Sequence, residues 1–145
     1  MSDEASTSFP GVDIGDEVGT ARTISESDVY LFAGLTGDIG PNHTNDSYMR
    51  ETAFGQRVAH GALTLGLMST CSTKLIERMG NPPVVNYGYE RVRFVRPVFF
   101  GDTVTVRYIV REIDEDRGLL TAEATATNQR DEVVAAATNL LRRFT

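Results

Sequence analysis

The first third of the chain shows the hydrophobic spacing of helices. In the segment 26–36, apolar residues recur three and four positions apart, which is the period of one helix face. Ser25 precedes this segment and the acidic Asp28 follows three residues later, a pattern typical of a helix N-cap. We therefore predict a helix over Glu26–Thr36 that ends at Gly37, and a second, short helix over Asn45–Thr52.

The longest predicted helix covers Val58–Arg78. Its residues are apolar or small on almost every face, and a helix of this kind is usually buried. Small residues such as Ala62 and Gly66 would let a sheet approach its backbone closely. The most apolar stretch, Val58–Cys71, is shorter than the roughly 20 residues that a bilayer span needs, so we expect no membrane span.

Beyond Pro83 the pattern changes to a period of two, which is typical of strands. Apolar and polar residues alternate in four runs, at 91–96, 104–111, 121–127 and 132–144. Glycine, asparagine and aspartate cluster between the runs and mark turns. Four consecutive strands joined by short turns predict an antiparallel meander, and we predict a further short strand near Val18–Ile24.

These elements together predict one α+β domain, in which an antiparallel sheet wraps around one long buried helix, the hot-dog arrangement. The chain has 145 residues, of which 41% are hydrophobic and 23% charged, as in ordinary globular domains. We assign residues 11–145 to this domain and residues 1–10, which offer little to bury, to a flexible N-terminal tail. The acidic N-terminus lacks the pattern of a secretory peptide, so we expect a cytoplasmic protein.

Composition narrows the classes of partner and cofactor. The chain carries 20 acidic and 14 basic residues, a net charge of −6, whereas nucleic-acid-binding proteins present basic faces; we therefore expect no nucleic acid. Cys71 is the single cysteine, so no disulfide can form within the chain, and a lone cysteine in an apolar run usually serves packing. Zinc-ligand spacing and a glycine-rich phosphate loop are both missing from the sequence, so we expect neither metal nor cofactor.

The two histidines of the chain, His43 and His60, carry the candidate chemistry. His43 follows Asp38 by five residues, across Gly40 and Pro41, and a rigid loop of this kind can bring a carboxylate and an imidazole to one point. Such a pair suits general acid–base catalysis, because imidazole titrates near neutrality. The spacing alone also fits an aspartate that caps a turn and a histidine at the surface or at an interface.

The sequence around this pair resembles the signature of the MaoC-like dehydratases, the (R)-specific enoyl-CoA hydratase family. The residues that match the signature are Phe32, Leu35, Thr36, Gly37, Asp38, Pro41 and His43. Two further blocks, 54–63 and 92–102, are similar to the family's segments at the start of the central helix and at a strand and turn. Three positions depart from the family pattern: Gly40 replaces the usual Asn, Asn42 an aliphatic residue, and Met49 an Ala or Ser.

The resemblance implies a hot-dog homodimer, which could assemble further, with its active site at the subunit interface. It implies reversible addition of water across the 2,3 double bond of an enoyl thioester of coenzyme A or acyl-carrier protein. Asp38 and His43 would be the catalytic acid–base pair, and because we expect His43 on a loop, His43→Ala should abolish hydration but leave folding nearly unchanged. The backbone N–H of Gly61, at the positive end of the buried helix, would bind the thioester oxygen.

Four residues are candidates for substrate binding: His60, Ser69, Arg93 and Arg96. His60 and Ser69 would line the site, and the arginines would contact the anionic part of the thioester, since a guanidinium suits phosphate. Each has an alternative interpretation. His60 could be structural, the Ser69 hydroxyl could bond a helix carbonyl, and the arginines could belong to a solvated strand face.

Two other functions fit the same sequence. One is a thioesterase of the same fold, in which activated water attacks the thioester carbonyl. The other is a non-catalytic subunit that binds acyl thioesters. Asp38→Asn would separate the two, because it should abolish turnover in an enzyme but leave ligand binding in a non-catalytic subunit largely intact.

Overall fold

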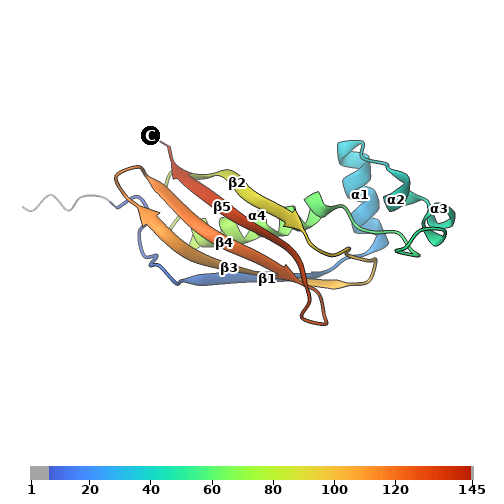
Figure 1. The fold of residues 1–145 in the computed structure, drawn as a ribbon. Helices are drawn as coiled ribbons and strands as arrows, with labels where there is room; N and C mark the ends of the chain where they lie inside the picture. Colours follow the sequence, from blue (N-terminus) through green and yellow to red (C-terminus); the bar gives the residue numbers. More distant parts are fainter. Residues whose placement is uncertain (1–6, 145) are drawn as a thin grey trace, which may run out of the picture.

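An antiparallel sheet of five strands lies along the long helix α4 (Figure 1). The structure is a computed structural model that describes residues 7–144. The strands are β1 (Glu17–Thr23), β2 (Val84–Phe94), β3 (Thr103–Asp114), β4 (Leu119–Thr127) and β5 (Val133–Arg143). The helices are α1 (Glu26–Thr36), α2 (Pro41–Thr44), α3 (Asp46–Arg50) and α4 (Gly61–Arg78). This arrangement confirms the predicted α+β hot-dog domain.

The strand order is β1-β3-β4-β5-β2. The predicted meander is confirmed for β3, β4 and β5 but is wrong for β2, which pairs with β5 and not with β3. The connecting segment 95–102 must therefore cross three strand spacings, about 14 Å, which eight residues reach easily. Alternation identifies strands but not their partners, so the sequence could not distinguish this crossing from a hairpin.

One face of α4 packs on the sheet. Its buried residues are Thr64, Met68, Cys71, Ser72 and Leu75, whereas Ala62 and Gly66 on the other side are exposed. We expected α4 to be buried on every face. In the single chain, only the face that packs on the sheet is buried. Burial raises the pKa of the Cys71 thiol to about 11, so the thiol stays protonated near neutral pH. The helices described include none that is long and apolar enough to cross a membrane.

The expected N-terminal tail is partly wrong. Residues 1–6 lie outside the described residues, but Phe9 is only 2% exposed and belongs to the core. The backbone N–H of Ser8 donates a hydrogen bond to the Glu115 carboxylate, at 2.7 Å. The buried ring of Phe9 and the bond from Ser8 thus dock the end of the expected tail on the domain.

Helices α1, α2 and α3 form a helical cap beyond one end of the sheet (Figure 1). Ser25 and Asp28 make the expected capping box of α1, and Gly37 ends the helix in the left-handed conformation, at φ 80°, which glycine adopts at least cost. Helix α3 confirms the second predicted helix with tighter bounds. Helix α2 lies in the segment expected to be irregular.

Arg57 joins this helical cap to the rest of the domain. Its guanidinium donates to the Glu26 carboxylate and to the Tyr30 hydroxyl of α1, both at 2.8 Å. The same group lies 4.8 Å from the centre of the Phe100 ring, within cation–π range. The segment that leads into α4 is therefore held against both the cap and the β2–β3 connection.

We predict that the capping box makes stability depend on pH in acid. The hydrogen bond from Arg22 and the bond from the Ser25 backbone lower the pKa of Asp28 to about 2. Because this value lies below the ordinary 3.8, the carboxylate stabilises the fold above pH 4, and its contribution decreases as the pH falls toward 2. Asp28→Asn should lower Tm by about 2–5 °C at pH 7, and the curves of Tm against pH should converge near pH 2. Parallel curves would contradict the assignment.

Candidate active site

The turn after α1 and the short helix α2 place Asp38 and His43. Gly37 reverses the chain, and the backbone N–H of Asp38 donates to the Thr36 hydroxyl at 3.2 Å. Pro41 then opens α2, since proline suits the first helical turn. His43 lies in this helix and is only 8% exposed. His43 is therefore buried in a short helix, and the expectation that it lies on a loop is wrong.

The buried ring of His43 is held by a backbone carbonyl. Its Nδ1 donates to the oxygen of Val58 at 2.7 Å, and the Val58 N–H donates to the carbonyl of Asn42 at 3.0 Å. A carbonyl only accepts, so the hydrogen of the neutral ring is on Nδ1 and the lone pair is on Nε2. His43 can therefore take a proton at Nε2.

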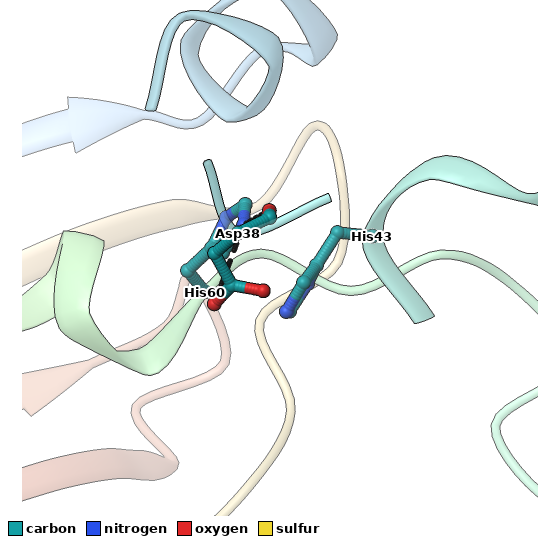
Figure 2. A group of neighbouring side chains, drawn as sticks. All are labelled: Asp38, His43 and His60. Atoms are coloured by element: carbon teal, nitrogen blue, oxygen red, sulfur yellow. Dashed lines mark hydrogen bonds and ion pairs between the residues drawn. The ribbon is translucent and has the colours of Figure 1, made fainter. Parts of the chain in front are cut away.

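His60 lies behind this pair, as the last residue before α4 (Figure 2). It is 2% exposed, and its Nε2 donates to the backbone carbonyl of Asp38 at 2.8 Å. Its ring stacks on His43 with 3.7 Å between ring centres, and Phe32 lies at 4.6 Å. Within residues 7–144, the buried Nδ1 has no hydrogen-bond partner. His60 thus holds both the backbone of Asp38 and the ring of His43.

The carboxylate of Asp38 extends from this cluster toward His43 (Figure 2). The side chain is 58% exposed, with Oδ2 at 4.0 Å from His60 Nε2, and one ligand atom from each of Asp38, His43 and His60 lies within 4.8 Å of the others. Such a set could be considered for a metal. The two rings are stacked, however, with 23° between their planes, so their in-plane lone pairs lie in nearly parallel planes and do not converge on one ion at bonding distance. The geometry suits proton transfer better.

A cavity of about 330 Å³ joins His43 to the start of α4. His43 and Gly61 line it, together with Asn42, Phe94, Arg96 and several apolar residues. The side chain of His60, the N-cap residue, makes no capping bond, and the first N–H groups of a helix have no partner within the helix. The N–H of Gly61 is thus placed to bind a negatively charged oxygen in the cavity.

Glycine at position 61 is required by space. A Cβ there would lie 2.6–2.7 Å from three ring carbons of Phe94, so a side chain fits only if Phe94 moves. The ring of Phe94 therefore packs directly on the helix start and forms one wall of the cavity. Sequence reasoning selected Gly61 but missed Phe94, although this residue lies in the third block of the family resemblance.

The structure brings some of the other predicted residues to this cavity. Arg96 lines it, and its guanidinium donates to the carbonyl of Val133 at 2.9 Å. Arg93 is exposed and donates to the carbonyl of Val92, outside the residues that line the cavity. Ser69 lies two turns along α4, also outside the cavity. The hydroxyl of Ser69 was expected to bond a helix carbonyl. In the part of the chain that the structure describes, it is instead the Ser72 hydroxyl that donates to a helix carbonyl, that of Ser69, at 2.7 Å.

Comparison with known proteins identifies the family. Residues 11–134 match the family model described as MaoC like domain. The chain belongs to the MaoC-like family. The MaoC-like chain is 38% identical over 119 residues to the (R)-specific enoyl-CoA hydratase of Rhodospirillum rubrum, a match that covers 82% of this chain and 80% of the relative. It is 37% identical over 109 residues to the 3-hydroxybutyryl-CoA dehydratase of Methylorubrum extorquens, covering 75% and 67%.

A solved structure shares the architecture of this MaoC-like domain. The R-hydratase PhaJ1 of Pseudomonas aeruginosa, in its unliganded form, superposes with a TM-score of 0.80 at 27% identity. The match covers 93% of this chain and 85% of the other. The resemblance inferred from the three sequence blocks is therefore confirmed at the level of family and fold.

We predict that the two histidines are opposite tautomers when neutral. His43 should carry its hydrogen on Nδ1, because Val58 accepts from that atom, and His60 should carry it on Nε2, because Asp38 accepts there. The ¹⁵N chemical shifts of the two rings distinguish the tautomers, and the spectrum of a His43→Asn variant assigns the signals. If both rings carried the hydrogen on the same nitrogen, one of the two carbonyl contacts would have to be repulsive and this geometry would be wrong.

Proposed function

We propose that this MaoC-like protein adds water reversibly across the 2,3 double bond of an enoyl thioester, giving the (R)-3-hydroxyacyl thioester. The observation that carries the proposal is that His43 links two neighbourhoods: one ligand atom of Asp38 and one of His43 lie within 4.8 Å of each other, and His43 and Gly61 line the same cavity. The names of its relatives, an (R)-specific enoyl-CoA hydratase and a 3-hydroxybutyryl-CoA dehydratase, support the same reaction.

The reaction divides between Asp38 and His43. Conjugation to the thioester makes C3 electrophilic, so the oxygen of a water held by Asp38 forms a bond to C3 while His43 Nε2 takes one of its protons. The π electrons move toward C2 and the thioester oxygen. The proton that left the water then passes from His43 through Asp38 to C2, so both side chains return to their starting protonation state. The net change is one H at C2 and one OH at C3.

Gly61 would stabilise the charge that develops on the thioester oxygen. A fixed backbone N–H at a helix start, in a site partly closed to water, is worth more in the transition state than in the ground state. Burial of His43 and packing of Phe94 on Gly61 hold the two ends of the reacting group at fixed positions. Reacting groups that are held in the correct geometry react faster, because less entropy is lost on the way to the transition state.

Arginines and a second subunit complete the proposed site. Arg96, at the cavity, and Arg93, near the end of β2, would contact the anionic part of a coenzyme A or acyl-carrier-protein thioester. Ser69 would contact the substrate only where a partner subunit closes the face of α4 that the single chain leaves open. The cytoplasmic location expected from the sequence stays a prediction.

The second copy would cover an apolar groove between α1 and α4. Leu31 and Leu35 on its rim are 72% and 88% exposed, and large exposed apolar residues that cluster mark an interaction surface. In the described chain β2 is also an edge strand, with unpaired backbone groups that another strand can bind. Both features support the homodimer.

The test of the reaction follows the absorbance of the enoyl group and the release of free thiol together, with crotonyl-CoA as substrate. We expect loss of absorbance without thiol. His43→Asn should lower kcat by about 10²–10⁴-fold, because asparagine can still donate to the Val58 carbonyl but has no basic nitrogen. Asp38→Asn should lower turnover similarly while crotonyl-CoA still binds.

The outcomes separate the three functions. Thiol release would assign a thioesterase that attacks the carbonyl instead of C3. Binding without either signal, unchanged in Asp38→Asn, would assign a non-catalytic subunit. The Tm of each variant should stay within a few degrees of the parent, so that a loss of rate is not a loss of fold.

We predict that the dimer depends on the groove between α1 and α4. Leu35→Glu places a charge on this apolar surface and should shift the protein to a monomer in sedimentation or light scattering, with loss of hydratase activity. Ile14→Glu is the matched control, because Ile14 is also exposed, at 65%, but lies outside the groove. A Leu35→Glu variant that stays dimeric, or a fully active monomer, would refute this interface.

A further inference from the structure

Gly40 is a glycine in a place where the backbone does not require one. Its φ and ψ are −52° and 145°, close to polyproline II, which every residue adopts. The following Pro41 favours the same region. A glycine also costs more conformational entropy on folding than any other residue. Backbone conformation therefore gives no reason for glycine at this position.

The space beside the Cα of Gly40 is taken by the side chain of Asn42. A Cβ on residue 40 would lie 2.7 Å from Asn42 Oδ1, closer than real contacts allow. It would also lie 3.6 Å from Asp38 Oδ1 and 3.8 Å from His43 Cδ2. Residues 40 and 42 thus compete for one position beside the acid–base pair, and here the carboxamide of residue 42 fills it.

The backbone of Asn42 is fixed although its side chain is exposed. Its carbonyl accepts a hydrogen bond from Val58 N–H at 3.0 Å, and the neighbouring His43 donates to the Val58 carbonyl. Asn42 also lines the cavity that His43 and Gly61 share. The bonds of Asn42 and His43 to Val58 therefore hold the backbone of Asn42 beside the cavity, and its Oδ1 lies against Gly40, next to Asp38 and His43.

We propose that Asn42 is the residue that positions the reacting water against Asp38, and that Gly40 makes room for it. A carboxamide both donates and accepts hydrogen bonds and does not titrate. It can therefore bond the water whether the transferred proton is on the water, on His43 or on Asp38. The proposal rests on the hydratase function. In the family pattern the Asn stands at position 40 and an aliphatic residue at 42; in this chain the carboxamide comes from two residues later and meets the same pair.

The first test removes the carboxamide in two ways. Asn42→Leu deletes it, and Gly40→Ala adds a Cβ that displaces it. Each should lower kcat on crotonyl-CoA by about tenfold or more with KM within about threefold. Tm should stay level, because Asn42 is exposed and can swing away. Gly34→Ala is the matched control, since an added Cβ there meets nothing within 4 Å, and it should keep parent activity.

The second test exchanges the two positions. Gly40→Asn alone crowds Asn42 and should also lower kcat, whereas the double variant Gly40→Asn with Asn42→Leu should recover to within about threefold of the parent. Near-parent rates for both Asn42→Leu and Gly40→Ala, or a double variant no faster than its slower single parent, would overturn the proposal. A parent protein that does not hydrate crotonyl-CoA would instead count against the hydratase function itself.

Discussion

The contacts of one buried imidazole hold the candidate site together. His60 immediately precedes α4, whose inner face is anchored on the sheet, so its ring has a fixed place. From there it donates to the backbone of Asp38 and stacks on His43. The next residue, Gly61, supplies the N–H at the helix start. Asp38 and His43 come from the segment that follows α1, and Gly61 begins α4; His60 contacts the first two residues and directly precedes the third.

This arrangement has an energetic cost. The Nδ1 of His60 is buried without a partner within residues 7–144, and an unsatisfied buried polar atom costs about 1–3 kcal/mol. Packing between Phe32 and His43 offsets part of that cost. Proteins retain such local violations mainly at functional sites. His60 was expected to line the substrate site, but it is absent from the cavity wall, and its contacts point to support of the reacting groups.

Local features of the sequence were sufficient to predict local structure. Ser25 and Asp28 determine where α1 starts, and Gly37 determines where it ends, so its bounds could be predicted from neighbouring residues alone. The proximity of Asp38 and His43 could also be predicted, because the rigid segment between them is short. The burial of His43 could not, since it depends on Val58 and His60, which are contacts made across the fold.

Features that depend on distant segments escaped prediction. The pairing of β2 with β5 is decided by the crossing of 95–102 at the end of the sheet, and alternation carries no signal for it. The burial of Phe9 could not be predicted because its neighbours in sequence are polar. The contact of Phe94 with Gly61 could not be predicted because Phe94 lies in an ordinary run of strand residues. Gly40 and Asn42 were visible as two departures from the family pattern, but only the geometry shows that a Cβ at position 40 would collide with the side chain of Asn42.

The central claim is that the Asp38 carboxylate, the His43 imidazole and the Gly61 N–H all act on one thioester bound in the cavity beside α4. The most direct measurement is a crystal structure of the Asp38→Asn variant with crotonyl-CoA bound. The account predicts the thioester oxygen at about 3 Å from the nitrogen of Gly61, with C3 facing Nε2 of His43. A thioester bound in the groove between α1 and α4, with the Gly61 N–H free of the substrate, would contradict it.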